Sequence, residues 1–156
     1  MRPTTVLIAI GLILASGSRS PAQDLTAFVN GEPITELDIT ECIRLTEILT
    51  HRNPPRQDAL DELIDEKLKL QIVRRYGLEP AGTNVDDAYD DVARRAGMTP
   101  QQFTHALAGV RVSVAAVKRR IKADMAWFLM LRGTPFPVRA KHYLRQLRQS
   151  ALIEIR

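Results

Sequence analysis

The residues of this chain that could do chemistry do not fall into a catalytic or metal-binding spacing. Its three histidines stand far apart: His51, His105 and His142. No His-Glu-x-x-His, Cys-x-x-Cys, glycine-rich phosphate loop or Gly-x-Ser-x-Gly motif is present. Four aspartates cluster between residues 86 and 91, but their spacing places them along an exposed helix face rather than around a cation. The sequence therefore predicts no enzyme site, no metal site and no cofactor.

The single cysteine, Cys42, has no partner for an intrachain disulfide, so packing must hold the domain together. It falls on the apolar side of a predicted helix, which favours a buried, unreactive thiol over a reactive one. Aromatic residues make up only 5% of the chain, so we expect no large stacking platform for nucleic-acid bases.

Residues 92–103 resemble a helix-turn-helix, because Gly97 marks a turn and Thr99-Pro100 opens a second helix. The helix that would enter the DNA groove, residues 100–108, carries no lysine or arginine, and the helix before it is acidic. Such a surface does not hold phosphates. We therefore predict no nucleic-acid partner.

The first 22 residues have the pattern of a secretory signal peptide. Arg2 supplies the basic start, residues 6–15 form an apolar run, and small residues stand at the −3 and −1 positions of a cut after Ala22. The apolar run is shorter than the about 20 residues that a membrane-spanning helix needs, although an uncleaved anchor is the alternative. No cysteine follows the run, so a lipoprotein is not expected. We predict an exported protein whose residues 23–156 form one domain.

Charge is unevenly distributed along the mature chain. Residues 23–110 contain 9 Lys/Arg and 16 Asp/Glu, whereas residues 111–156 contain 11 and 2. One interpretation, which we favour, is that an acidic half and a basic half pack together and partly neutralise each other. The other is that the basic half faces an anionic partner such as a lipid headgroup.

Capping residues and helix stops predict six helices. Thr35 with Asp38, and Thr99 with Gln102, have the spacing of capping boxes. The predicted starts lie near Thr35, Arg56, Asn84, Thr99, Ser113 and Val138, and the predicted stops include Gly77, Gly97 and Gly109. Residues 56–76 are apolar on more than one stripe, which predicts a central helix packed on two sides.

Two short extended segments, 25–30 and 151–156, flank the helices. A lone strand leaves its backbone groups without hydrogen bonds, so we expect the two segments to pair with each other. The predicted fold is mainly α, with about six helices and a small β-pair formed by the N-terminal and C-terminal segments of the mature chain. A Pro-rich joint at residues 133–137 leads into the last helix.

The remaining candidate for function is an apolar surface. The fifth predicted helix has an apolar stripe formed by Val114, Val117, Ile121, Met125 and Phe128. Its end, residues 125–131, is apolar on all sides. This end is either buried under the last helix or forms a flexible surface that holds other apolar chains. The residues of the candidate client-binding surface are Met125, Trp127, Phe128, Leu129, Met130 and Phe136.

Five segments occur in an order that is typical of one family. They are residues 29–38 (Val-Asn-Gly-Glu-Pro-Ile-Thr-Glu-Leu-Asp), 59–68, 96–99, 117–125 and 143–155. Together they resemble the N-terminal domain of SurA-type periplasmic chaperones, with the helix and strand that close that domain. The resemblance spans essentially the whole mature chain.

The resemblance implies a periplasmic chaperone that holds extended, aromatic-rich segments of unfolded outer-membrane or envelope proteins. Typical members carry one or two parvulin prolyl-isomerase domains, of about 90 residues each, between the fifth helix and the last one. Here residues 134–137 occupy that place. We therefore expect a chaperone without isomerase activity. An envelope scaffold that binds one fixed partner is the alternative.

Overall fold

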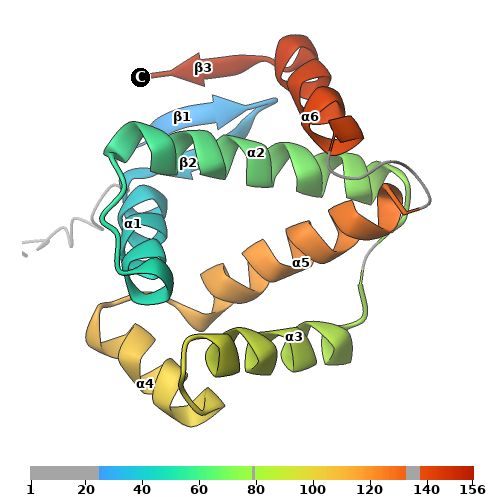
Figure 1. Cartoon of the computed structure of the whole chain (residues 1–156). Coiled ribbons are helices and arrows are strands. Elements are labelled where there is room, and N and C mark those ends of the chain that lie inside the picture. Colours follow the sequence, from blue (N-terminus) through green and yellow to red (C-terminus); the bar gives the residue numbers. More distant parts are fainter. Residues whose placement is uncertain (1–24, 79, 133–137) are drawn as a thin grey trace, which may run out of the picture.

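The computed structural model describes residues 25–78, 80–132 and 138–156. These residues form six helices and one three-stranded sheet, so the described chain is mainly α, as predicted (Figure 1). In chain order the elements are β1 (Leu25–Val29), β2 (Glu32–Thr35), α1 (Glu36–Thr50), α2 (Arg56–Arg75), α3 (Gly82–Arg95), α4 (Pro100–Gly109), α5 (Val114–Met130), α6 (Val138–Ser150) and β3 (Ile153–Ile155). The expected signal peptide with its cut after Ala22, and the Pro-rich joint at 133–137, lie outside the described residues.

The two ends of the domain pair in the sheet, which confirms the sequence prediction. β1 is the central strand, and β3 runs antiparallel to it with Val29 opposite Ile153 and Ala27 opposite Ile155. The third strand, β2, was not predicted. It forms a hairpin with β1 through Asn30-Gly31, whose φ angles of 51° and 82° suit the tight turn for which Asn-Gly is preferred.

The helix starts follow the predicted caps with one exception. Thr35 and Thr99 form complete capping boxes, and Ser113 accepts a hydrogen bond from the N–H of Ala116. The predicted cap of the third helix was wrong: α3 begins at Gly82, because the carbonyl of Ala81 already accepts a hydrogen bond from the N–H of Val85. Asn84 therefore lies inside the first turn of α3.

The glycine stops are correct at two positions and displaced at the third. Gly77 and Gly97 take positive φ angles directly after α2 and α3. Gly109 is instead the last residue of α4, and Arg111 takes the left-handed conformation with φ 57°. The N–H of Val112 then reaches back to the carbonyl of Leu107, a pattern that closes a helix end two residues later than predicted.

Helix α2 is the centre of the domain, as the sequence predicted. It packs against α1, α5, α6 and the sheet. One group of core residues lies between the sheet, α1 and α2, a second is enclosed by α1, α3, α4 and α5, and a third lies where the end of α5 meets α2 and α6. In Figure 1, α6 and β3 stand above α2 and return the chain to β1. Among the described residues, no helix is long and apolar enough to cross a membrane.

Candidate functional site

The apolar end of α5 is divided between the core and the solvent. Trp127 is buried in the third core group, where its ring stacks on Tyr143 of α6 with the ring centres 5.7 Å apart. Phe128 and Leu129, which follow directly, are 53% and 44% exposed. The segment is therefore buried at Trp127 and exposed at Phe128 and Leu129.

The methionines of the segment lie at the border between core and surface. Met125 is partly buried against the core group of α3, α4 and α5, and Met130 is partly buried against the Trp127 group. A thioether on an unbranched side chain adapts to partners of different shape. Phe136, the last residue of the predicted surface, lies outside the described residues. We use the term "α5 surface" below for Met125, Phe128, Leu129 and Met130.

The apolar stripe of α5 is packed in the core along most of its length but not at Phe128. Val117, Ile121 and Met125 pack toward α3, near Val85 and Tyr89, whereas Phe128, one turn further along α5, is exposed. Figure 1 shows the reason: α5 diverges from α3 along its length and approaches the C-terminal half of α2. The apolar stripe therefore continues past the helix that covers it, and its last member faces solvent.

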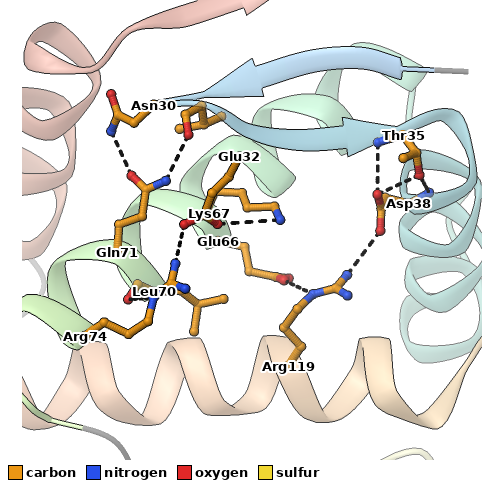
Figure 2. Close-up of polar contacts among 11 residues, drawn as sticks. Asn30, Glu32, Thr35, Asp38, Glu66, Lys67, Leu70, Gln71, Arg74 and Arg119 are labelled. Atoms are coloured by element: carbon orange, nitrogen blue, oxygen red, sulfur yellow. Dashed lines mark hydrogen bonds and ion pairs between the residues drawn. The ribbon is translucent and has the colours of Figure 1, made fainter. Parts of the chain in front are cut away.

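A polar network fixes the sheet and α1 on the two central helices (Figure 2). Arg119 of α5 donates from Nε to Glu66 of α2 at 2.7 Å, and from Nη2 to Asp38 of α1 at 3.4 Å. The other oxygen of Asp38 accepts from the backbone N–H and the hydroxyl of Thr35. One arginine thus connects α5 to α2 and to the start of α1.

A second set of contacts in Figure 2 joins the β1–β2 turn to α2. Asn30 donates from its amide nitrogen to Gln71 at 2.7 Å, and Gln71 donates to the carbonyl of Val29 at 2.9 Å. Arg74 and Lys67 both pair with Glu32. The amide oxygen of Asn30 also accepts the N–H of Leu152, just before β3. The turn therefore holds the C-terminal segment as well as α2.

Side chains of the acidic and basic parts of the sequence pair with each other, which confirms the favoured interpretation for these side chains. Arg120 pairs with Glu62, Lys118 with Asp86 at 2.7 Å, and Arg148 with Asp61 at 3.0 Å. In one pair the roles are reversed: Lys69 from the acidic half, in α2, pairs with Asp124 from the basic half, in α5, at 2.6 Å. Lys118, Arg119, Arg120 and Arg148 of the basic C-terminal half thus pair with carboxylates of the acidic half.

The predicted unreactive cysteine is buried between α1 and α2. Burial raises the pKa of the Cys42 thiol to about 12, and the nearby negative charge of Glu62 adds to the effect. Its Sγ donates to Glu62 at 3.6 Å. Because the thiolate is the nucleophilic form, this thiol is unreactive at neutral pH in the folded protein.

The three histidines lie on separate elements: His51 follows α1, His105 is in α4 and His142 is in α6. Within the described ranges, no group of three or more His, Cys, Asp or Glu side chains is arranged to hold a metal ion. Asp86 and Asp91, two members of the aspartate cluster, pair with Lys118 and Arg94.

Comparison with known proteins agrees with the resemblance read from the motifs. A chaperone SurA of Chromohalobacter salexigens is 25% identical over 130 residues, which cover 77% of this chain and 29% of that protein. A chaperone SurA of Polaromonas is 31% identical over 118 residues, which cover 70% of this chain and 22% of that protein. The chain spans less than a third of the length of these curated relatives. No protein-family model matches it.

A solved chain from a study of two SurA-like chaperones of Campylobacter jejuni is 21% identical, with a TM-score of 0.38. The match covers 80% of this chain and 50% of that one. The sequence similarity, rather than this structural overlap, confirms that the chain resembles SurA-type chaperones.

Proposed function

We propose that this protein is an exported, periplasmic chaperone that binds unfolded segments of envelope or outer-membrane proteins. Two observations support the proposal: the sequence similarity to proteins named chaperone, and the α5 surface. The signal-peptide pattern of residues 1–22 supports export. Isolation of the protein from a periplasmic fraction, with a new N-terminus at residue 23, would test that part.

The observation that carries the binding proposal is the exposure of Phe128 and Leu129 beside buried Trp127. Complete burial of one large apolar side chain stabilises a complex by about 1.5–3 kcal/mol. A client segment that covers two such side chains would bind weakly and without strict sequence selection. Weak, broad binding is what a chaperone for unfolded chains requires.

The test is the aggregation of an unfolded outer-membrane β-barrel protein after dilution from denaturant, followed by light scattering. We expect the mature protein to suppress the scattering. The double variant Phe128→Ser/Leu129→Ser should suppress it at most half as well at equal concentration. Leu37→Ser is the matched control, since Leu37 is 51% exposed on α1, away from the α5 surface.

Two results would count against the proposal. One is a lack of suppression by the unmodified protein at several-fold molar excess. The other is binding to one folded partner but to no unfolded peptide in a mixed peptide library, which is the behaviour of an envelope scaffold.

We also propose weak contact with an anionic membrane surface, as a separate property. Lys141 and Arg145 are exposed on α6, and charge attracts such side chains to anionic headgroups. Co-sedimentation with vesicles that contain 30% phosphatidylglycerol should exceed that with pure phosphatidylcholine vesicles and should fall with added salt. Equal binding to both kinds of vesicle would exclude this contact.

A further inference from the structure

We infer that the outer edge of β3 binds an extended segment of an unfolded protein as a fourth strand of the sheet. This inference rests on the proposed chaperone function. It adds a second binding site, on the C-terminal strand β3, which lies in the same sheet as the β1–β2 hairpin. It would hold the backbone of a client, whereas the α5 surface would hold apolar side chains.

The hydrogen bonds of β3 determine which of its backbone groups point outward. The N–H of Asn30 donates to the carbonyl of Leu152, and the N–H of Arg156 donates to the carbonyl of Thr26, each at 2.8 Å. Glu154 lies opposite Phe28 between these two bonds. In an antiparallel pair, alternate residues bond to the neighbour, so the N–H and C=O of Ile153 and Ile155 point away from β1.

Among the described residues, no strand pairs with that outer edge, since the sheet order is β2-β1-β3. β3 is short and carries the charged Glu154, but it lacks the proline that blocks strand addition at the other edge. β2, at the other edge, contains Pro33 and a charged Glu32 held by Lys67, whereas β3 reads Ile-Glu-Ile. Leu152 and Ile155 are each 63% exposed. Of the two edge strands in the described sheet, β3 is therefore the one without a proline.

The chemistry of the edge specifies its occupant. Alternating outward N–H and C=O groups are satisfied by an extended backbone, because a helix already uses its own groups. The segment would carry apolar or aromatic residues opposite Ile153 and Ile155, and a basic or neutral residue opposite Glu154. A second copy of β3 fits less well: an antiparallel pairing that uses both isoleucines places Glu154 opposite Glu154 of the other copy, and like charges repel there.

Amide hydrogen exchange of the full mature protein tests the inference at single-residue level. The probe is a capped eight-residue peptide in which Val or Tyr alternates with Thr or Lys. At saturating peptide, we expect the amides of Ile153 and Ile155 to gain protection, while that of Glu154, which faces β1, changes little. Unchanged exchange at both isoleucines would overturn the inference.

A pair of variants at one position supplies a second readout. Ile155→Pro removes the outward N–H, and loss of one such hydrogen bond should weaken peptide binding about fivefold. Ile155→Val keeps the donor and should bind as the unmodified protein does. If the proline variant disturbs the structure of β3, the amide exchange of Ile153 and Ile155 in the unmodified protein still shows whether the peptide binds along this edge.

The aggregation assay separates failure of this inference from failure of the proposed function. Suppression of aggregation without protection at Ile153 and Ile155 overturns only the fourth-strand binding and leaves the α5 surface as the site. Absence of both overturns the chaperone function together with this inference.

Discussion

Arg119 of α5 connects the start of α1 to the central helix α2. Its partner Glu66 is 8% exposed, so this carboxylate depends on the arginine for its charge compensation. Asp38, the second partner, is also the residue that completes the cap of α1. A charge left buried without its partner costs more free energy than the pair contributes.

We therefore expect Arg119→Met to lower the free energy of unfolding by about 2 kcal/mol. The matched control is Arg94→Met, which removes an ion pair with Asp91 that is exposed on both sides and should cost less than about 1 kcal/mol. Urea unfolding followed by Trp127 fluorescence measures both. Equal losses in the free energy of unfolding for the two substitutions would show that the Arg119–Glu66 pair stabilises the domain no more than an exposed ion pair does.

Cys42 gives a prediction with a defined pH dependence. Because its pKa is raised to about 12, the folded protein keeps the thiol proton at pH values where the unfolded chain, with a pKa of about 8.5, loses it. The thiol contribution to stability is therefore complete below about pH 8.5 and is lost as pH rises toward 12.

Iodoacetamide at pH 8.5 should modify the native protein far more slowly than the same protein in urea, since only the unfolded chain exposes a thiolate. Mass spectrometry against time measures the two rates. Equal rates would mean that the thiol is exposed or that the domain opens readily.

At the scale of elements, α6 and β3 close the domain that β1 begins. Tyr143, Leu144 and Leu147 pack against the residues of α2 and α5 in the core, and Arg148 anchors α6 to Asp61 and Asp65. β3 supplies the pairing partner for one edge of β1. The C-terminal segment is thus part of the same core as residues 25–78.

Deletion of residues 138–156 should expose Trp127 and the outer edge of β1 together. We expect a loss of at least about 3 kcal/mol, because several large apolar side chains lose their partners. That is a large fraction of the stability of a small domain, so the truncated protein should be insoluble or unfold at much lower urea.

Asn30→Ala is the milder test of the same closure. It removes the side-chain bonds to Gln71 and to the N–H of Leu152 but leaves the core intact. It should cost about 1 kcal/mol and increase exchange of the β3 amides. If both the deletion and Asn30→Ala leave the urea midpoint unchanged, the C-terminal segment does not belong to the folding unit.

At the scale of the whole molecule, the connection between α5 and α6 limits what the chain can do. Seven residues, 131–137, separate the end of α5 from the start of α6. A catalytic domain of about 90 residues does not fit within that interval. We therefore predict that the protein has no prolyl-isomerase activity, whatever the activity of longer relatives.

A protease-coupled assay on a short Ala-Pro peptide measures this. The cis-to-trans phase should keep its uncatalysed time of tens of seconds at 25 °C in the presence of the protein. A faster phase that persists through further purification would refute the prediction.

Local signals in the sequence determined most of the elements. Helix caps depend on a side chain and backbone three residues apart, so Thr35 with Asp38 and Thr99 with Gln102 could be identified without tertiary information. The pairing of the two ends followed from the need of each strand for a partner. The Asn30-Gly31 dipeptide indicates a hairpin turn and therefore a strand after it. The strand itself, β2, has only four residues and contains Pro33, so its pattern is too weak to identify a strand alone.

Tertiary structure alone decided which apolar residues of α5 are exposed. The sequence around residues 125–131 is apolar on all sides, so periodicity could not distinguish Trp127, which is buried, from Phe128, which is exposed. That distinction depends on where α3 diverges from α5 and where α6 lies against it. The outer edge of β3 is likewise a property of the strand order, which is set by contacts between residues more than 100 positions apart.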